Sequence, residues 1–194
     1  MKSRSKKKMQ PESVRLDLKT FAMQPFKRRN EVKLSGLKEY FSDIKAAEQI
    51  LSKGKDPIIY EYYEYTMPET GGHLTFGVTT IFPGKVGKEY YLTRGHYHDK
   101  DEAEIYINLS GKGGLLMQTK KGETMYLDLK PGDIGYVPPG WGHRTINTGD
   151  EKMVFFFVYP SDAGHDYGLV KEKGFAKIVI EKNGVPKVVD NPKF

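Results

Sequence analysis

The segment that decides the fold is RGHYHDKDEAEIY, residues 94–106. His96 and His98 stand two positions apart, so in an extended backbone both imidazoles point to the same face. Glu104 follows on the next predicted strand, and His143 lies on a later strand that closure of a barrel would bring near. Imidazole nitrogens with a carboxylate oxygen suit Fe(II), Mn(II), Ni(II) or Zn(II), and they leave positions for water or substrate. The predicted ligands of one divalent metal ion per subunit are His96, His98, Glu104 and His143.

After Pro57, the sequence pattern is that of an all-β barrel, with turn-forming residues between short strand-forming runs. Short runs rich in aromatic and β-branched residues alternate with Gly, Pro, Asp and Asn, which is typical of short antiparallel strands. The runs are 58–66, 74–82, 89–93, 104–109, 114–118, 124–129, 133–137, 143–147, 152–159, 177–181 and 185–189. Asn183-Gly184 separates the last two runs and predicts a type I′ turn, hence a C-terminal β-hairpin. So many short strands in so little chain predict a jelly-roll β-barrel.

The chain before the barrel is expected to add only small elements. Residues 23–32 are mostly polar and are interpreted as an approach to the barrel. Over residues 37–51, apolar residues recur every three or four positions, which predicts a short N-terminal helical segment of one or two helices. Ser42 or Asp43 is available as the N-cap of its second half.

The composition excludes several classes of protein. We predict a disordered basic tail over residues 1–12 and a single domain over residues 13–194, because 194 residues suffice for one domain with its own core. The absence of cysteine excludes disulfides and thiolate chemistry. Most of the net charge of +6 comes from the tail, and no nucleic-acid-binding pattern accompanies it, so no nucleic-acid partner is expected. No apolar run suggests a membrane span or a secretory signal, so we expect a soluble, cytoplasmic protein with no membrane partner.

The two histidine segments resemble the paired motifs of the cupin family, which implies a cupin jelly-roll barrel. The first motif matches at His96, His98, Glu104 and Gly111. The second motif matches at Gly132, Pro138, Gly140, His143 and Asn147. The first motif departs from the family in two ways, because Tyr90 replaces its opening glycine and the spacer before the glutamate is longer than usual. The longer spacer makes Glu102 a competing ligand, but Glu104 keeps the family's gap to Gly111 and is preferred.

Further segments resemble the cupin-type glucose-6-phosphate isomerases of archaea and some bacteria. These segments are residues 83–89, 93–98, 160–168 and 188–192. The resemblance implies a homodimer that interconverts glucose 6-phosphate and fructose 6-phosphate in glycolysis and gluconeogenesis, with Fe(II) as the first candidate metal. It assigns catalytic roles to Glu104, His165 and Tyr167. It assigns substrate binding to Tyr60, Thr79, Thr93, Gly95 and Tyr106.

Several alternatives stay open at this point. Glu104 is the candidate base at carbon, but a metal-bound carboxylate is a weaker base than a free one, so a metal-assisted hydride shift competes. An Fe(II) dioxygenase or a non-catalytic sugar-binding cupin would use the same barrel. A slip of one residue would put Thr80 in the place of Thr79. Trp141 and Arg144 flank the third histidine of the site and are expected to serve packing and surface charge.

Overall fold

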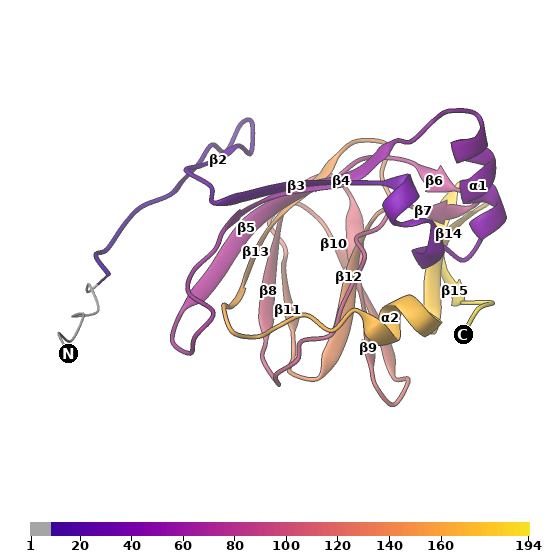
Figure 1. Cartoon of the computed structure of the whole chain (residues 1–194). Coiled ribbons are helices and arrows are strands. Elements are labelled where there is room, and N and C mark those ends of the chain that lie inside the picture. Colours follow the sequence, from indigo (N-terminus) through magenta and orange to yellow (C-terminus); the bar gives the residue numbers. More distant parts are fainter. Residues whose placement is uncertain (1–8) are drawn as a thin grey trace.

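Two facing antiparallel sheets form the body of the molecule in a computed structural model that describes residues 9–194 (Figure 1). The first sheet has the strand order β11 (Ile134–Val137), β8 (Glu104–Ser110), β13 (Met153–Pro160), β5 (Leu74–Ile81), β4 (Ile58–Tyr65) and β3 (Arg28–Lys33). The second has the order β10 (Thr124–Leu129), β9 (Gly113–Thr119) and β12 (Trp141–Asn147). Together they form the all-β cupin jelly roll that the two motifs predict. The predicted tail falls partly on residues 1–8, which lie outside the described residues.

Smaller elements flank these two sheets. One further sheet has the order β15 (Val185–Asp190), β14 (Lys177–Lys182), β7 (Glu89–Tyr90) and β6 (Lys85–Val86), and another pairs β1 (Arg15–Leu16) with β2 (Met23–Gln24). The helical elements are η1 (Leu34–Gly36), η2 (Lys38–Tyr40), α1 (Ile44–Ser52) and α2 (Gly168–Lys173). Asn183 and Gly184 both have positive φ, at 55° and 74°, which confirms the predicted C-terminal hairpin turn.

The predicted strands are confirmed, with ends shifted by a residue or two, except around the first histidine motif. The run predicted over 89–93 ends as the short strand β7. His96 and His98 lie beyond it, in an extended segment held by isolated bridges rather than in a continuous strand. The polar stretch interpreted as an approach to the barrel contains all of β3 but its last residue, and in this edge strand only Val32 is buried. An edge strand with one buried residue has no apolar alternation to reveal it.

The predicted helical segment, residues 37–51, contains the 3₁₀ turn η2 followed by the α-helix α1, and the 3₁₀ turn η1 precedes it. Asp43 is the N-cap of α1, where its Oδ1 accepts a hydrogen bond from the Ala46 N–H at 2.9 Å. The segment before it is not regular helix, because its backbone bends to bury Leu34, Leu37 and Phe41 completely. The sequence periodicity therefore predicted the buried face correctly but not the helix type.

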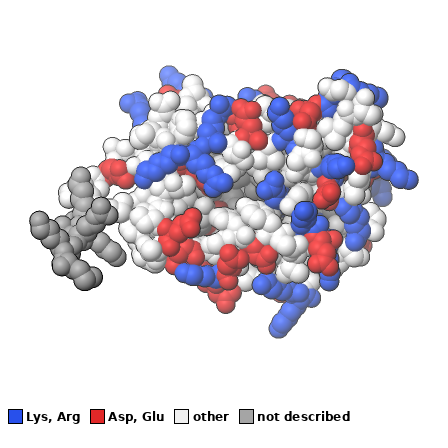
Figure 2. Space-filling view, in the orientation of Figure 1, with Lys and Arg blue, Asp and Glu red and all other residues white. Residues whose placement is uncertain are grey.

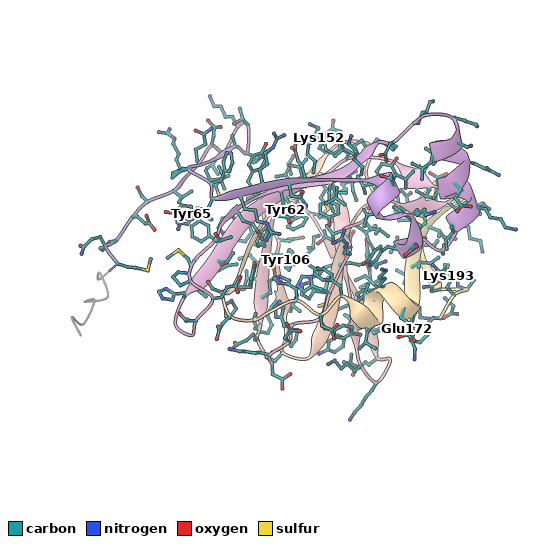
Figure 3. The ribbon with its side chains drawn as sticks, in the orientation of Figure 1. Tyr62, Tyr65, Tyr106, Lys152, Glu172 and Lys193 are labelled. Carbon is teal, nitrogen blue, oxygen red and sulfur yellow. The ribbon has the colours of Figure 1, made fainter. Side chains whose placement is uncertain are left out.

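Aromatic side chains of the large sheet pack against one another in the interior. Tyr106 lies in the interior, as Figure 3 shows, and its ring is 5.2 Å from that of Phe155. Phe157 stacks on Tyr159 with ring centroids 5.9 Å apart. On the face seen in Figure 2, basic and acidic side chains are interspersed. Among residues 9–194, no helix has both the length and the apolar character needed to cross a membrane.

Candidate metal centre

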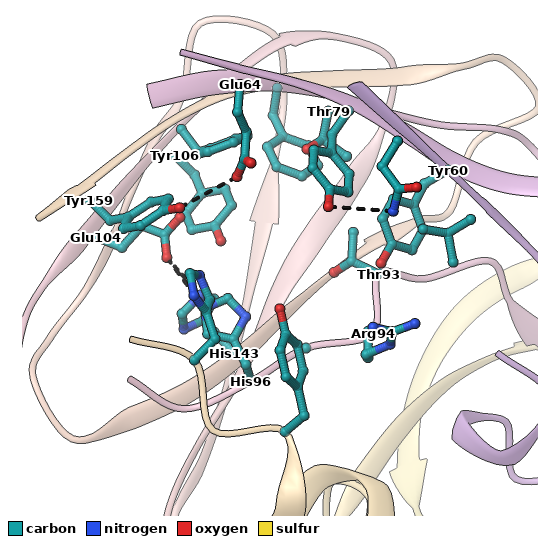
Figure 4. Close-up of a pocket in the computed structure, with 18 of the residues that line it drawn as sticks. Tyr60, Glu64, Thr79, Thr93, Arg94, His96, Glu104, Tyr106, His143 and Tyr159 are labelled. Atoms are coloured by element: carbon teal, nitrogen blue, oxygen red, sulfur yellow. Dashed lines mark hydrogen bonds and ion pairs between the residues drawn. The ribbon is translucent and has the colours of Figure 1, made fainter. Parts of the chain in front are cut away.

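Four side chains from distant parts of the chain converge inside the barrel. The residues that each contribute one ligand atom, all within 4.8 Å of one another, are His96, His98, Glu104 and His143. Glu104 is the first residue of β8, His143 lies in β12, and the other two histidines come from the segment between β7 and β8. Glu104 and His143 are almost completely buried, at 3% and 1% exposed. Figure 4 shows the Glu104 carboxylate and the imidazoles of His96 and His143 directed toward one point.

Reciprocal backbone hydrogen bonds hold the first histidine segment against β12. The His96 N–H donates to the His143 carbonyl at 3.1 Å, and the His143 N–H donates to the His96 carbonyl at 2.9 Å. Tyr97 exchanges a similar pair of hydrogen bonds with Asp166, at 3.0 and 2.8 Å. Gly142 permits this close approach, because a Cβ there would lie 2.5 Å from the Tyr97 ring. The spacing of the histidines is thus set by the backbone.

Backbone carbonyls fix the orientation of two of the imidazoles. His98 Nδ1 lies 2.8 Å from the Glu102 carbonyl oxygen, and His143 Nδ1 lies 3.3 Å from the Trp141 carbonyl oxygen. A carbonyl can only accept a hydrogen bond, so Nδ1 carries the proton and Nε2 keeps its lone pair for a metal. Glu102 therefore serves the site through its backbone, and its carboxylate does not belong to the converging cluster.

The converging atoms lack hydrogen-bond partners among the described residues. Nε2 of each histidine and Oε2 of Glu104 are buried without such a partner. Nevertheless, Glu104 Oε2 lies 2.9 Å from His143 Nε2 and 3.3 Å from His98 Nε2. Lone pairs at these distances repel unless a proton or a cation lies among them. The donor set and its geometry fit a divalent cation bound by three imidazoles and one carboxylate.

Burial and mutual proximity perturb the titration of the centre. Burial lowers the pKa of His96 well below its usual value, and the neighbouring His143 and His165 lower it further, so His96 is neutral. Burial alone would raise the pKa of Glu104, but His143 and His98 together hold it far below the ordinary range. A neutral imidazole and an ionised carboxylate are the protonation states that metal binding requires.

A pocket opens beside the four converging side chains. The residues that line it are Arg28, Asn30, Val32, Tyr60, Tyr62, Glu64, Thr79, Thr93, Arg94, Gly95, His96, Glu104, Tyr106, His143, Phe155, Phe157, Tyr159, His165 and Tyr167. All the residues expected to bind substrate or act in catalysis therefore lie around one cavity. Thr79 faces this cavity, whereas Thr80 faces the opposite side of β5. His165 stacks on Tyr167 with ring centroids 6.0 Å apart, and burial lowers the pKa of His165 to about 4.

Comparison with known proteins places the chain in a family. The family model described as glucose-6-phosphate isomerase (GPI) matches residues 31–193. The chain belongs to the glucose-6-phosphate isomerase family. A glucose-6-phosphate isomerase of Pyrococcus abyssi is 50% identical over 186 residues, which covers 95% of this chain and 97% of the relative. A putative glucose-6-phosphate isomerase 1 of Rhizobium meliloti is 36% identical over 97% of this chain and 89% of the relative.

Among solved structures, the chain is similar to an S161A mutant of Bacillus subtilis oxalate decarboxylase. The TM-score is 0.43 with 23% sequence identity, and the match covers 57% of this chain and 29% of that chain.

Several pocket residues of this family member were not expected from the sequence. Tyr62 and Glu64 lie on β4 at positions two and four after Tyr60, so strand parity places all three on the same face. Counting alternate residues of the strand from Tyr60 would have predicted both Tyr62 and Glu64 as pocket residues. Tyr159 belongs to a run of aromatic residues on β13, where a pocket residue cannot be told from a core residue by pattern alone.

Arg144 was expected to serve packing and surface charge, and the second part of this expectation is wrong. Its side chain is buried at 2% exposure, and its guanidinium lies 4.6 Å from the centre of the Phe175 ring. Nη2 donates a hydrogen bond to the Arg94 carbonyl at 2.9 Å. Arg144 thus holds in place the backbone that leads into Gly95 and the first histidine of the site.

Proposed function

We propose that this chain interconverts glucose 6-phosphate and fructose 6-phosphate in the pocket beside the four converging side chains. The observation that carries the proposal is the arrangement of the pocket. One side holds a buried donor set suited to a divalent cation, and the other holds the hydroxyl of Thr93 and the cation of Arg94 (Figure 4). A sugar phosphate has hydroxyl oxygens for the first side and an anionic group for the second.

The proposed cofactor is one divalent metal ion per subunit, with Fe(II) as the first candidate and Mn(II), Ni(II) or Zn(II) as alternatives. Its proposed ligands are His96, His98, Glu104 and His143. When bound, such an ion acts as a Lewis acid that stabilises negative charge on the sugar oxygen next to the reacting carbons. The chain prepares for it by keeping the imidazole of His96 neutral and the Glu104 carboxylate ionised.

The phosphate group is proposed to bind among Tyr60, Thr79, Thr93 and Gly95. Thr93 Oγ1 accepts a hydrogen bond from the Thr145 N–H at 3.0 Å, so the oxygen is fixed and the hydroxyl proton is free to donate to a phosphate oxygen. Gly95 brings the backbone close to the same region, as its φ of +75° allows. We assign Tyr106, buried at 6% exposure beside the imidazole of His143, to a contact with the sugar.

Proton movement is assigned to Glu104, His165 and Tyr167. A proton must move between two adjacent carbons, and Glu104 is the candidate base. Its pKa lies far below the ordinary range, which makes it a weak base in its resting position. His165 is neutral near pH 7 and lines the pocket with a partly buried imidazole. It can therefore accept a proton from a sugar hydroxyl when the ring opens. Tyr167, exposed at 39%, lines the same pocket and stacks on the imidazole of His165.

The test is an anaerobic assay of fructose 6-phosphate formation from glucose 6-phosphate. We expect turnover without O₂, loss of turnover after chelation, and recovery when Fe(II) or Mn(II) is added back. A requirement for O₂ would support an Fe(II) dioxygenase instead. Binding of the sugar phosphate without turnover in the parent protein, retained in Glu104→Gln, would support a non-catalytic sugar-binding protein.

A homodimer in the cytoplasm completes the proposal. The outer face of the large sheet carries apolar side chains, among them Phe76, Ile107 and Phe156, beside Val14 and Leu16 of the N-terminal segment. A second copy of the chain would cover this face. Light scattering at micromolar concentration should give twice the chain mass, and the mass of a single chain would contradict the dimer. The cytoplasmic location follows from substrates that belong to glycolysis and gluconeogenesis.

A further inference from the structure

One carboxylate in the pocket lies outside the proposed metal-binding cluster. Glu64 on β4 is 7% exposed. Its Oε1 accepts a hydrogen bond from the Tyr159 hydroxyl at 3.4 Å, while Oε2 is buried without a hydrogen-bond partner among the described residues. Arg28 Nη1 lies 3.5 Å from Oε2, an ion pair that supplies charge without a well-formed hydrogen bond. Oε2 therefore keeps an unused acceptor position.

Glu64 and the predicted phosphate contacts lie at opposite sides of the pocket. In Figure 4, Glu64 lies beside Tyr159 and above Glu104, whereas Thr93 and Arg94 lie on the other side of the cavity. Tyr60 shares the Arg94 side and precedes Glu64 by four residues on the same face of β4. Four residues of extended strand span about 13 Å, so the two sides are separated by roughly the length of a hexose phosphate.

A carboxylate at this position selects between chemical groups. An ionised carboxylate only accepts hydrogen bonds, so it favours a hydroxyl and opposes an anion. A close like-charge contact in a site shielded from water is strongly unfavourable. We infer that Glu64 is a specificity-determining residue that accepts a hydroxyl from the unphosphorylated end of the sugar and excludes a second phosphate from that end. This inference rests on the proposed function, because it takes the phosphate to bind beside Thr93.

The fold gains little from this carboxylate as a purely structural group. Its cation partner Arg28 has a side chain that is 62% exposed, and ion pairs with such an exposed member contribute little to stability. Burial raises the pKa of Glu64, which shows that the protein interior disfavours its charged form. A neutral side chain of similar size would fill the same space without that penalty.

The test compares two ligands that differ at the end far from the 6-phosphate. They are sorbitol 6-phosphate, which carries a hydroxyl there, and sorbitol 1,6-bisphosphate, which carries a phosphate there and is otherwise identical. The ratio of their inhibition constants is measured on the metal-loaded enzyme. In Glu64→Gln, which keeps size and removes charge, we expect the parent's preference for the monophosphate to fall about tenfold or more, the size expected when a close like-charge contact is removed. An unchanged ratio would overturn the inference.

Two further variants sharpen the result. Glu61→Gln is the matched control, because Glu61 lies on the same strand but faces away from the pocket, where it pairs with Arg29 at 3.1 Å. Its ratio should equal that of the parent, and a fall equal to that of Glu64→Gln would show a general charge effect and contradict the inference. Arg28→Gln removes the compensating cation from an exposed position, so at an alkaline pH that keeps the Glu64 carboxylate ionised the preference for the monophosphate should rise. A fall in this variant would also contradict a repulsive role for Glu64.

Failure of the proposed function remains separable from failure of this inference. The proposed function is tested by turnover of glucose 6-phosphate in the parent protein. If the parent does not turn over the sugar phosphate, dissociation constants from calorimetry give the same ligand ratio, and the effect of Glu64→Gln on that ratio still decides the selectivity question.

Discussion

Replacing Gly95 by alanine should weaken metal binding although no ligand is removed. Gly95 precedes His96 directly and has a φ of +75°, a conformation that costs an alanine about 1–2 kcal/mol. A Cβ at this position would also lie 2.9 Å from the His143 carbonyl oxygen and 2.9 Å from Arg144 Cβ. The His143 carbonyl is the acceptor for the His96 N–H, so the backbone pair that sets the spacing of two ligands must open.

The magnitude follows from the two separate costs. Overpacking against backbone typically costs about 1–3 kcal/mol, which adds to the conformational cost for a total of about 2–5 kcal/mol in the free energy of unfolding. Displacing a ligand by a fraction of an ångström should also reduce metal affinity, by about 10–100-fold as for altered supporting contacts. Urea unfolding of the metal-free protein measures the first quantity, and competition with a chelator measures the second.

The control for this prediction is Gly122→Ala. Gly122 also has a positive φ, at +90°, but a Cβ there meets no atom within 4 Å. It should therefore show the conformational cost alone, about 1–2 kcal/mol, and bind metal as the parent does. Equal metal affinity in Gly95→Ala and the parent would refute the argument that the backbone pair sets the spacing of the ligands.

Three further outcomes are expected. Glu104→Gln should lose metal while Glu102→Gln retains it in elemental analysis, because the second residue contributes only its carbonyl oxygen to the site; loss in both variants would contradict this distinction. Asp43→Ala should lower the free energy of unfolding by about 1 kcal/mol in urea, because α1 loses its N-cap hydrogen bond. Arg144→Met should lower the free energy of unfolding in urea by about 3–5 kcal/mol, because it removes one of two buried charges that stabilise each other and leaves the Glu89 carboxylate uncompensated. It should also raise the KM for glucose 6-phosphate several-fold, because the Arg94 carbonyl loses its donor, and an unchanged KM would show that this hydrogen bond does not position the pocket.

The barrel strands could be predicted because turn-forming residues mark their ends in the sequence. Aromatic and β-branched runs between Gly, Pro and Asn matched the observed strands closely, and the Asn183-Gly184 turn matched its backbone angles. The strand β3 was missed because it lies at a sheet edge with only Val32 buried, so it has no alternating apolar face. The helix α2 was missed because it has only six residues, too few to show a helical period.

The site could be predicted only where its residues are chemically scarce. Three of five histidines in two short segments pointed to the cluster that the structure brings together. The first two lie in an extended segment outside any regular strand, and isolated bridges to β12 and to Asp166 produce the convergence. Tyr159 belongs to a long run of strand, and only the pairing of β13 with β5 and β8 reveals which face of this strand borders the cavity.

The most direct test of the central claim is a titration of chelator-treated protein with Mn(II) while glucose 6-phosphate turnover is followed. Because one set of four side chains is proposed to hold one ion needed for the reaction, turnover should start near zero. It should then rise in proportion to the added metal and level off at one equivalent per chain. In His143→Ala the same titration should give no recovery at one equivalent. Full turnover before any metal is added would contradict the account.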